Sequence, residues 1–242
     1  MELVAESGDQ GARATDLGNA AELPVATARR ILQALVAERL LSFDKKAHRY
    51  SVGPAVFAYA VRANPWFSDR NEIVRVLEEI AAITGDTVLF SIRSGDEAIC
   101  LDRREGSYPI RVMSLGPGDR RPLGVGSGSA ALLTVAADDD RETILERCRD
   151  AYAHYDMSPD QVRSLLDEAR HTGYAYNSGR LVEGVHGVGV PVLDSAGTPA
   201  AISVAAVADR MDLDRRIQIV ETIRGCLESV SGVRAVDLRK AP

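Results

Sequence analysis

A proline-marked turn between two short helical segments is the feature that most restricts what this chain can fold into. Residues 14–22 (ATDLGNAAE) predict a short helix with Thr15 or Asp16 near its start. Pro24 follows, and proline suits the first turn of a helix because its missing N–H has no partner there. The next segment, VATARRILQALVAERLL, has apolar residues at helical spacing, and two short helices joined by a tight turn are typical of a helix-turn-helix. The predicted buried stripe of its second helix is Ile31, Leu32, Leu35 and Val36.

The second helix begins with polar and basic side chains. Thr27, Arg29 and Arg30 lie in its first turns, before the apolar stripe dominates. In a helix-turn-helix the second helix enters the major groove of DNA, and its early side chains reach the base edges. We therefore predict that these three residues contact bases or phosphates. Thr15, near the start of the preceding helix, is predicted to hold a phosphate.

A β-hairpin with a basic turn is predicted directly after the second helix. Residues 41–43 and 49–52 alternate as strands do, and residues 44–47 between them are typical of a turn. A hairpin in this place is a wing that contacts phosphate or the minor groove, and phosphate contacts add affinity without reading the sequence. This combination favours a winged helix-turn-helix over residues 1–53, rather than a small helical subdomain with a surface hairpin. The predicted phosphate contacts of the wing are Lys45, Lys46 and Arg49.

The formal charge is unevenly distributed along the chain. The whole chain carries −6 at pH 7, whereas residues 23–62 hold seven basic and two acidic residues, a net +5, which leaves −11 for the rest. The overall negative charge argues against a protein that coats nucleic acid without regard to sequence. One compact basic segment in an acidic chain is typical of a DNA-reading module joined to a regulatory body, although a solvated helix face has the same charge pattern.

Two prolines bracket the segment that follows the hairpin. Gly53-Pro54 opens AVFAYAVRA, and Asn64-Pro65 closes it, which predicts a short helix. Its apolar side chains have little within the segment to pack against. We therefore expect residues 54–69 to form a linker helix between domains or a dimer contact.

The remaining residues, 70–242, combine strand and helix patterns. The segment Ser158-Pro159-Asp160-Gln161 is a capping box that begins a helix ending at Gly173. Helices are also predicted over 71–84, 127–136 and 213–227, and strands over 87–93, 98–103, 110–115, 187–194 and 199–207. An antiparallel sheet with helices on its face or ends predicts an α+β sensor-like domain.

Composition excludes several classes of protein. No stretch approaches the roughly 20 apolar residues needed to span a bilayer, and the N-terminus lacks a signal-peptide pattern. Cys100, Cys148 and Cys226 are far apart and lack CxxC spacing, which argues against a disulfide framework or a thiolate zinc site. The four histidines are too scattered for a zinc-binding pair. We expect a cytoplasmic protein with no cofactor and no metal.

Six stretches of sequence, taken in their order along the chain, carry a resemblance to a known family. They are LPVATARRILQALVAERLL, RYSVG, GDTVLFSIRSGDEAICLDR, RRPLGVGSGSAALL, GYAYNSGRLVEGVHGVGVPVLDSAG and AAISVA. Together they resemble the IclR family of bacterial transcription regulators along nearly the whole chain. The resemblance implies an N-terminal winged helix-turn-helix and a C-terminal GAF-like effector domain. It also implies a homodimer or dimer of dimers on a palindromic DNA operator, with a small organic acid as effector, and leaves repressor and activator both open.

The resemblance further implies the residues of the effector pocket. Ser127 and Gly128 match loop residues whose backbone N–H groups hold a carboxylate. Asn177 stands where the family usually has an acidic residue, and Gly187 where it usually has a cysteine. These changes imply a roomier and less anionic pocket, so we expect an aromatic or branched carboxylate rather than a two- or three-carbon keto acid. The implied pocket residues are Met113, Ser127, Gly128, Asn177, Gly187, Ser203 and Ala205.

Two departures from the family pattern bear on function. Only MELVAES stands where the family has a full first helix, and Ser129-Ala130 stand where it has a lysine after the pocket-loop glycine. The first departure implies an incomplete core for the DNA-binding module. A small-molecule sensor without DNA binding is therefore an alternative function.

An enzyme that uses the α+β pocket is the second alternative, but its signatures are incomplete. Residues 126–131 match G-x-G-x-x-A, yet the acid at the required distance, Asp150, lies in a helical stretch instead of ending a strand. Ser127 lacks the G-x-S-x-G elbow because Val125 stands in place of the first glycine. His186 is predicted either to contact the effector or to be an exposed strand residue. We predict that the protein is not an enzyme.

Overall fold

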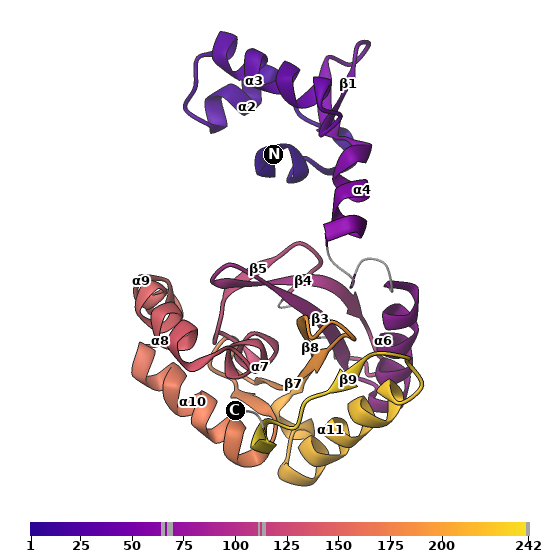
Figure 1. The fold of residues 1–242 in the computed structure, drawn as a ribbon, viewed down its shortest axis with the longest axis vertical. Helices are drawn as coiled ribbons and strands as arrows, with labels where there is room; N and C mark the ends of the chain where they lie inside the picture. The colour runs from indigo at the N-terminus through magenta and orange to yellow at the C-terminus, as the bar shows by residue number, and fades with distance from the viewer. Residues whose placement is uncertain (64–65, 67–69, 111, 113–114, 241–242) are drawn as a thin grey trace. The chain divides into compact units, whose positions relative to one another are not determined.

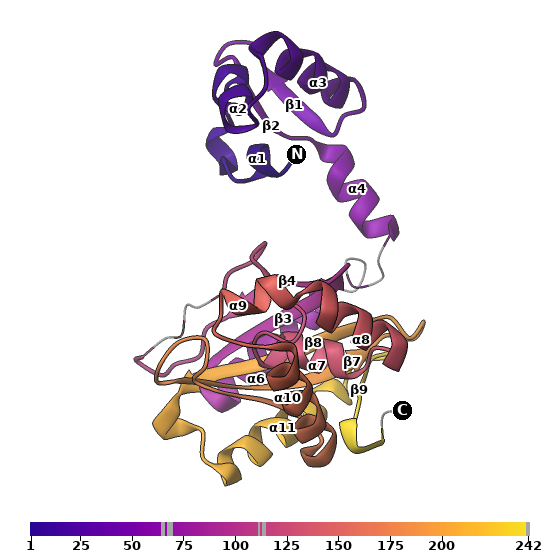
Figure 2. The same cartoon turned by 90° about the vertical axis from the view of Figure 1, so that its left-hand side faces the viewer.

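Short helices and a two-stranded hairpin form the first of two units into which the chain divides, Met1–Asp69 and Arg70–Pro242. The computed structural model describes residues 1–63, 66, 70–110, 112 and 115–240 (Figures 1 and 2). The first unit contains α1 (Glu2–Ala5), η1 (Gly8–Gln10), α2 (Ala14–Ala20), α3 (Val25–Ala37), β1 (Leu41–Asp44), β2 (Arg49–Val52) and α4 (Pro54–Ala63).

The core of the first unit draws on every element before α4 except η1. Val4 of α1 is only 2% exposed and packs in the same cluster as residues of α2, α3, β1 and β2. On α3, Leu32 is buried and Leu35 and Val36 pack against the cluster, as predicted. Ile31 is 47% exposed, so its predicted burial is wrong. Leu32 and the residue one turn earlier, Ala28, face the core, and Ile31 is rotated away from that face.

The hairpin has the register expected for a wing. Leu41 pairs with Val52 and Asp44 with Arg49, and residues 45–48 form the turn. A third short stretch joins it, because the backbones of Ala12 and Tyr50 exchange N–H···O hydrogen bonds of 2.8 and 2.9 Å. The wing is thereby fixed to the loop that precedes α2.

The second unit is built on one antiparallel sheet with the strand order β5-β4-β3-β8-β7-β6, in which β9 also pairs with the end of β7. The strands are β3 (Thr87–Ser94), β4 (Glu97–Arg104), β5 (Arg120–Pro122), β6 (Ala175–Ser178), β7 (Val185–Leu193), β8 (Pro199–Val207) and β9 (Arg234–Ala235). The helices are α6 (Arg70–Thr84), α7 (Ser127–Thr134), α8 (Asp138–Arg147), α9 (Arg149–Ala153), α10 (Pro159–Thr172) and α11 (Leu213–Leu227), with short 3-10 turns η2 (Ala208–Arg210) and η3 (Leu238–Lys240).

Helices cover both faces of this sheet. Figure 1 shows α6 and α11 along one side and α7 with α10 on the other. The helix α7 packs directly on β7, β8 and β3, and α10 packs on α7 from outside. All eight residues of α7 are buried, so it is an internal helix between the sheet and the outer helices.

The strand predicted over residues 110–115 is not found among the described residues, and a different segment pairs with β4. Of the segment 110–115, the described residues Ile110, Val112 and Leu115 are not in a strand. The edge of β4 pairs instead with β5, and the backbones of residues 118 and 119 extend this pairing along Cys100. The prediction failed because the later segment occupies the edge of β4 that β3 leaves open.

Helix ends agree with the sequence better than helix faces do. Ser158 and Gln161 form the predicted capping box, and Gly173 ends α10 in the left-handed conformation, with φ +91°. The last helix, α11, buries only part of its apolar side chains, because Leu213 and Ile217 are 58% and 43% exposed. Its C-terminal half, which includes the buried Ile223, faces the core.

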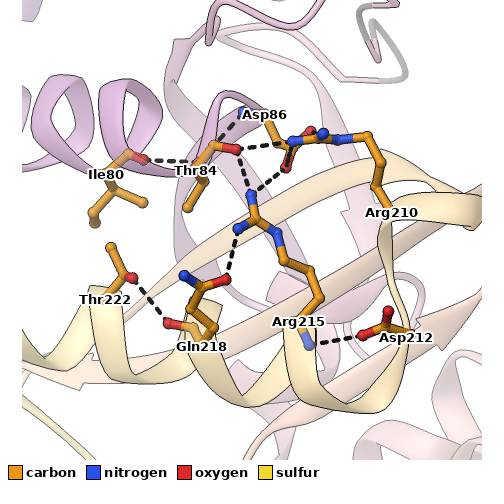
Figure 3. Close-up of polar contacts among 8 residues, drawn as sticks. All are labelled: Ile80, Thr84, Asp86, Arg210, Asp212, Arg215, Gln218 and Thr222. Atoms are coloured by element: carbon orange, nitrogen blue, oxygen red, sulfur yellow. Dashed lines mark hydrogen bonds and ion pairs between the residues drawn. The ribbon is translucent and has the colours of Figure 1, made fainter.

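A buried carboxylate joins α6, β3 and the start of α11 (Figure 3). The side chain of Asp86 is 2% exposed and accepts hydrogen bonds from Arg210 at 2.9 and 3.1 Å and from Arg215 at 3.3 Å. Both guanidinium groups also donate to the carbonyl oxygen of Thr84 at the end of α6. Arg210 further lies over the ring of Tyr108, 4.0 Å from its centroid. This arrangement satisfies a buried charge and a helix-terminal carbonyl with the same two cations.

We predict that Asp86→Asn lowers the free energy of unfolding by about 3 kcal/mol. The substitution removes the buried carboxylate and leaves the partly exposed guanidinium groups of Arg210 and Arg215 without their counter-charge. Urea denaturation followed by circular dichroism measures this change. The matched control is Asp96→Asn, which breaks an exposed 2.7 Å pair with Arg147 and is expected to cost about 1 kcal/mol or less. Equal losses in the two variants would contradict the role assigned to Asp86.

Candidate DNA-binding surface and effector pocket

The first turns of α3 present their polar side chains outward. Thr27, Arg29 and Arg30 are all exposed, as a base-reading or phosphate-binding role requires. They are exposed because Ala28 and Leu32 take the buried face of the helix. Their individual contacts with DNA stay predictions.

Two of the predicted DNA contacts lie together on a groove of the first unit. Thr15 of α2 and Arg29 of α3 both line it. Sequence reasoning missed three further polar residues there, Arg13, Gln33 and His48. The sequence could have indicated Gln33, because it lies four residues after Arg29 and therefore on the same face of the helix. The groove therefore joins residues of α2, α3 and the wing, and its lining combines polar with apolar side chains.

The tip of the wing is held by an acidic residue and presents two lysines. Oδ1 of Asp44 accepts hydrogen bonds from the backbone N–H groups of Lys46 at 2.7 Å and Ala47 at 3.0 Å. These bonds hold the pKa of the Asp44 carboxyl below its usual value. Lys45 and Lys46 are exposed at the turn, where a phosphate group has access to them. They are two of the three lysines in the chain.

Arg49 occupies a different position from the other predicted phosphate contacts. Its Nη1 donates to the carbonyl oxygen of Gly11 at 2.6 Å and, more weakly, to that of Gln10 at 3.4 Å. The side chain is half-buried, and its hydrogen bond to Gly11 joins residues that are 38 positions apart in the sequence. Arg49 therefore ties the wing to the loop before α2, and a phosphate contact from it stays a prediction.

Six of the seven predicted effector residues line one cavity of the second unit. The seventh, Met113, lies outside the described residues. The cavity has a volume of about 50 Å³ and receives residues from all strands of the main sheet order, from β5 at one edge to β6 at the other. The six residues are Ser127, Gly128, Asn177, Gly187, Ser203 and Ala205.

The cavity forms where α7 meets β7 at very short range. A Cβ atom on Gly189 would lie 2.2 Å from the carbonyl oxygen of Ser127, so a glycine is required there. A Cβ atom on Gly187 would lie 2.7 Å from the Ser127 hydroxyl. The hydroxyl therefore takes the space that a longer side chain at 187 would need. The gain of room expected from glycine at this position therefore stays a prediction.

Sequence reasoning missed a charged residue in this cavity, Arg121 of β5. Its side chain is half-buried, and burial lowers the pKa of its guanidinium. Alternation along the strand was the available signal, because successive strand residues face opposite sides. That signal is hidden when the strand is predicted over 110–115 instead.

His186 lines the cavity and continues into a chain of polar contacts. Its Nδ1 lies 2.7 Å from the hydroxyl of Tyr176, and the two rings meet edge-on with centroids 5.7 Å apart. The guanidinium of Arg216 lies over the ring of Tyr176, 4.0 Å from its centroid. Nε of Arg216 donates to the carbonyl oxygen of Met211 at 3.0 Å, just before α11. These contacts connect the cavity wall to the start of α11.

The described residues carry neither a membrane span nor a metal cluster. None of the described helices is long and apolar enough to cross a bilayer. Within the same residues, no group of three or more histidine, cysteine, aspartate or glutamate side chains is placed to hold a metal ion.

Comparison with known proteins identifies both units. The model of the bacterial transcriptional regulator IclR C-terminal domain matches residues 70–232, and that of the IclR helix-turn-helix domain matches residues 1–45. The chain is 28% identical over 208 residues to the probable transcriptional regulator SauR of Cupriavidus necator, which covers 85% of this chain and 82% of SauR. It is 24% identical over 225 residues to the HTH-type transcriptional repressor AllR of Escherichia coli K12, covering 90% and 81%.

A solved structure has the same fold. The crystal structure of an IclR homolog from Microbacterium hydrocarbonoxydans, complexed with 4-hydroxybenzoate, matches with a TM-score of 0.72 at 21% identity, over 90% of this chain and 91% of that one. The predicted α+β fold with an N-terminal helix-turn-helix is confirmed. The chain belongs to the IclR family and is an IclR-type helix-turn-helix transcriptional regulator.

Proposed function

We propose that this regulator binds a palindromic DNA operator as a dimer or tetramer, and that a small organic carboxylate in the cavity of the second unit changes its affinity for DNA. The observation that supports this most is the match of both units to IclR domains. The exposed basic start of α3 and the lysines at the wing tip supply the required chemistry. We propose no cofactor, and the cytoplasm as the compartment, because bacterial operator DNA lies there.

The proposed organisation has three parts: residues 1–53 as DNA-binding domain, 54–69 as linker helix and 70–242 as effector domain. None of the residues of α4 is buried within the chain. Phe57 and Tyr59 on this helix are 67% and 53% exposed. Large exposed apolar side chains on a helix favour a contact with another copy of the chain, which supports the proposed self-association.

A DNA-free sensor and an enzyme are less well supported. The short helix α1 places the buried Val4 in the core of the first unit, which supports a packed DNA-binding module. For an enzyme, the thiols are poor nucleophiles, since burial raises the pKa of Cys100 to about 11. The relatives named above are regulators, and we propose that this chain likewise has no catalytic activity.

The proposed effector is an aromatic or branched carboxylate. The related structure with 4-hydroxybenzoate supports this class. The cavity volume of about 50 Å³ is well below the roughly 150 Å³ of a dry cavity that accepts benzene. We therefore propose that the loop between β6 and β7 moves when the effector enters, because its Leu181 and Val182 form part of the cavity wall.

We predict operator binding with a steep salt dependence that the wing lysines carry. Lys45→Ala and Lys46→Ala are each expected to lower affinity for operator and nonspecific duplex alike, and to flatten the salt slope by about one unit for each phosphate that is no longer bound. Fluorescence anisotropy against the intergenic DNA beside the gene, across a salt series, measures both quantities. Lys240→Ala, the third lysine, is the matched control and should change neither. Equal, weak binding of the wild-type chain to both duplexes would favour the sensor without DNA binding.

We predict that benzoate, 4-hydroxybenzoate and isovalerate raise the melting temperature more than glyoxylate and pyruvate do at equal concentration. A ligand that binds only the folded state stabilises it in proportion to the logarithm of its concentration over Kd. A thermal-shift panel measures this order. Stabilisation by the two smallest keto acids alone would contradict the proposed effector class.

We predict that Tyr176→Phe weakens effector binding by about three- to tenfold, because a hydrogen bond contributes about 0.5–1.5 kcal/mol and this one orients His186. In the tautomer with its proton on Nε2, Nδ1 of His186 accepts a hydrogen bond from the Tyr176 hydroxyl. Calorimetric titration with the best carboxylate of the panel measures the affinity. Tyr108→Phe, which keeps the aromatic ring that lies under Arg210, is the control. Unchanged affinity in the Tyr176 variant would exclude this role for His186.

A further inference from the structure

The strand β5 carries two consecutive arginines in very different surroundings. Arg120 is directed to solvent, where its Nη1 lies 3.0 Å from Oε2 of Glu97 and both side chains are more than 40% exposed. Arg121, which pairs with Ala98 across the sheet, lines the cavity instead. Successive strand residues face opposite sides of the sheet, so the backbone itself places one guanidinium outside and the other inside.

The guanidinium of Arg121 lies close to the start of the internal helix α7. Its Nη1 is 3.5 Å from the position that a Cβ atom on Gly126 would occupy, and Gly126 is the N-cap of α7. The first residues of this helix, Ser127 and Gly128, line the same cavity. The N–H groups of a helix N-terminus and the positive end of its dipole favour an anion. A permanent cation and a helix N-terminus thus meet at one wall.

The rest of the cavity wall is largely apolar, with Leu89, Val125 and Ala205 among its side chains. Burial lowers the pKa of the Arg121 guanidinium, while the charges of Tyr155 and Asp119 act in the opposite direction. A half-buried guanidinium binds most strongly to a planar oxyanion that accepts two parallel hydrogen bonds. A carboxylate on a compact apolar group therefore matches both the guanidinium and the apolar side chains of the wall.

We propose that Arg121 binds the carboxylate of the effector and makes the pocket select acids over their neutral analogues. This inference rests on the proposed function of the cavity as effector site. It adds the residue that reads the charge, and it predicts that an amide of the same shape binds poorly. An inorganic phosphate ion fits the same charge but not the apolar wall.

The test compares Arg121→Gln with Arg120→Gln in the full-length protein. Arg120→Gln removes the same charge from the same strand, on the solvent side, and Arg121→Lys keeps the charge without the bidentate fork. Melting temperature and calorimetric Kd are measured with acetate, isovalerate and benzoate, with benzamide and isovaleramide as neutral analogues, and with inorganic phosphate. Affinity for operator DNA without added ligand is measured in parallel by anisotropy.

We expect the carboxylate that binds best to bind Arg121→Gln about 10- to 100-fold more weakly, Arg121→Lys with an intermediate loss, and Arg120→Gln as it binds the wild-type chain. The amides should bind the wild-type chain weakly and be insensitive to Arg121→Gln. Equal binding of acid and amide, an unchanged Kd in Arg121→Gln, stabilisation by phosphate alone, or no stabilisation by any of the three carboxylates would overturn the proposal. Operator binding without ligand should persist in all variants, so its absence in the wild-type chain would refute the proposed function separately.

Discussion

The proposed effector pocket depends on the close packing of one helix against one strand. The backbone of Ser127 lies so near β7 that a side chain at Gly189 would collide with its carbonyl oxygen. This approach buries all of α7 and brings its N-terminus over the middle of the sheet. A side chain at Gly189 would collide with the backbone of Ser127 and Gly128 and force β7 and the start of α7 to shift. The shape of the pocket therefore depends on this contact as well as on the residues that line it.

The same contact explains why pocket composition is a poor guide to pocket size. Replacing a cysteine by glycine removes atoms from the strand, but the hydroxyl of Ser127 lies within 2.7 Å of the position that the first of those atoms would take. Protein interiors are packed to nearly crystalline density, so neighbouring groups take up space that a smaller residue leaves. Room for a larger ligand has to come from the walls that are not packed in this way. The loop that carries Leu181 and Val182 is such a wall, and Val182 is 43% exposed.

The sequence predicted local structure well and long-range placement poorly. Pro24, the capping box at Ser158 and the alternating strands depend on interactions within a few residues, and their elements form where predicted. The edge strand was misplaced because alternation in one segment does not reveal which of two segments pairs with β4. Periodicity located the core-facing side of α3 through Leu32, Leu35 and Val36 but not the edge of the buried face, so Ile31 was assigned wrongly.

The candidate sites show the same division. Six pocket residues came together because a family resemblance carries three-dimensional information that periodicity lacks. Arg121 was missed because its direction depends on its place in β5, and the structural contact of Arg49 with Gly11 spans 38 residues. In both cases the position of the side chain depends on how distant segments pair, which the local sequence does not reveal.

The charge distribution links the two proposed binding events. Outside the basic segment 23–62 the chain carries a net −11, so most of its surface repels phosphate and carboxylate alike. Affinity for DNA then has to come from a small basic surface, and it has to fall steeply with salt. An anionic effector faces the same repulsion on approaching the acidic second unit. A guanidinium at a helix N-terminus inside the cavity reverses the potential locally, where low polarity makes charge interactions strongest. In the proposed pocket, an arginine in this wall thus allows an acidic domain to hold an acid.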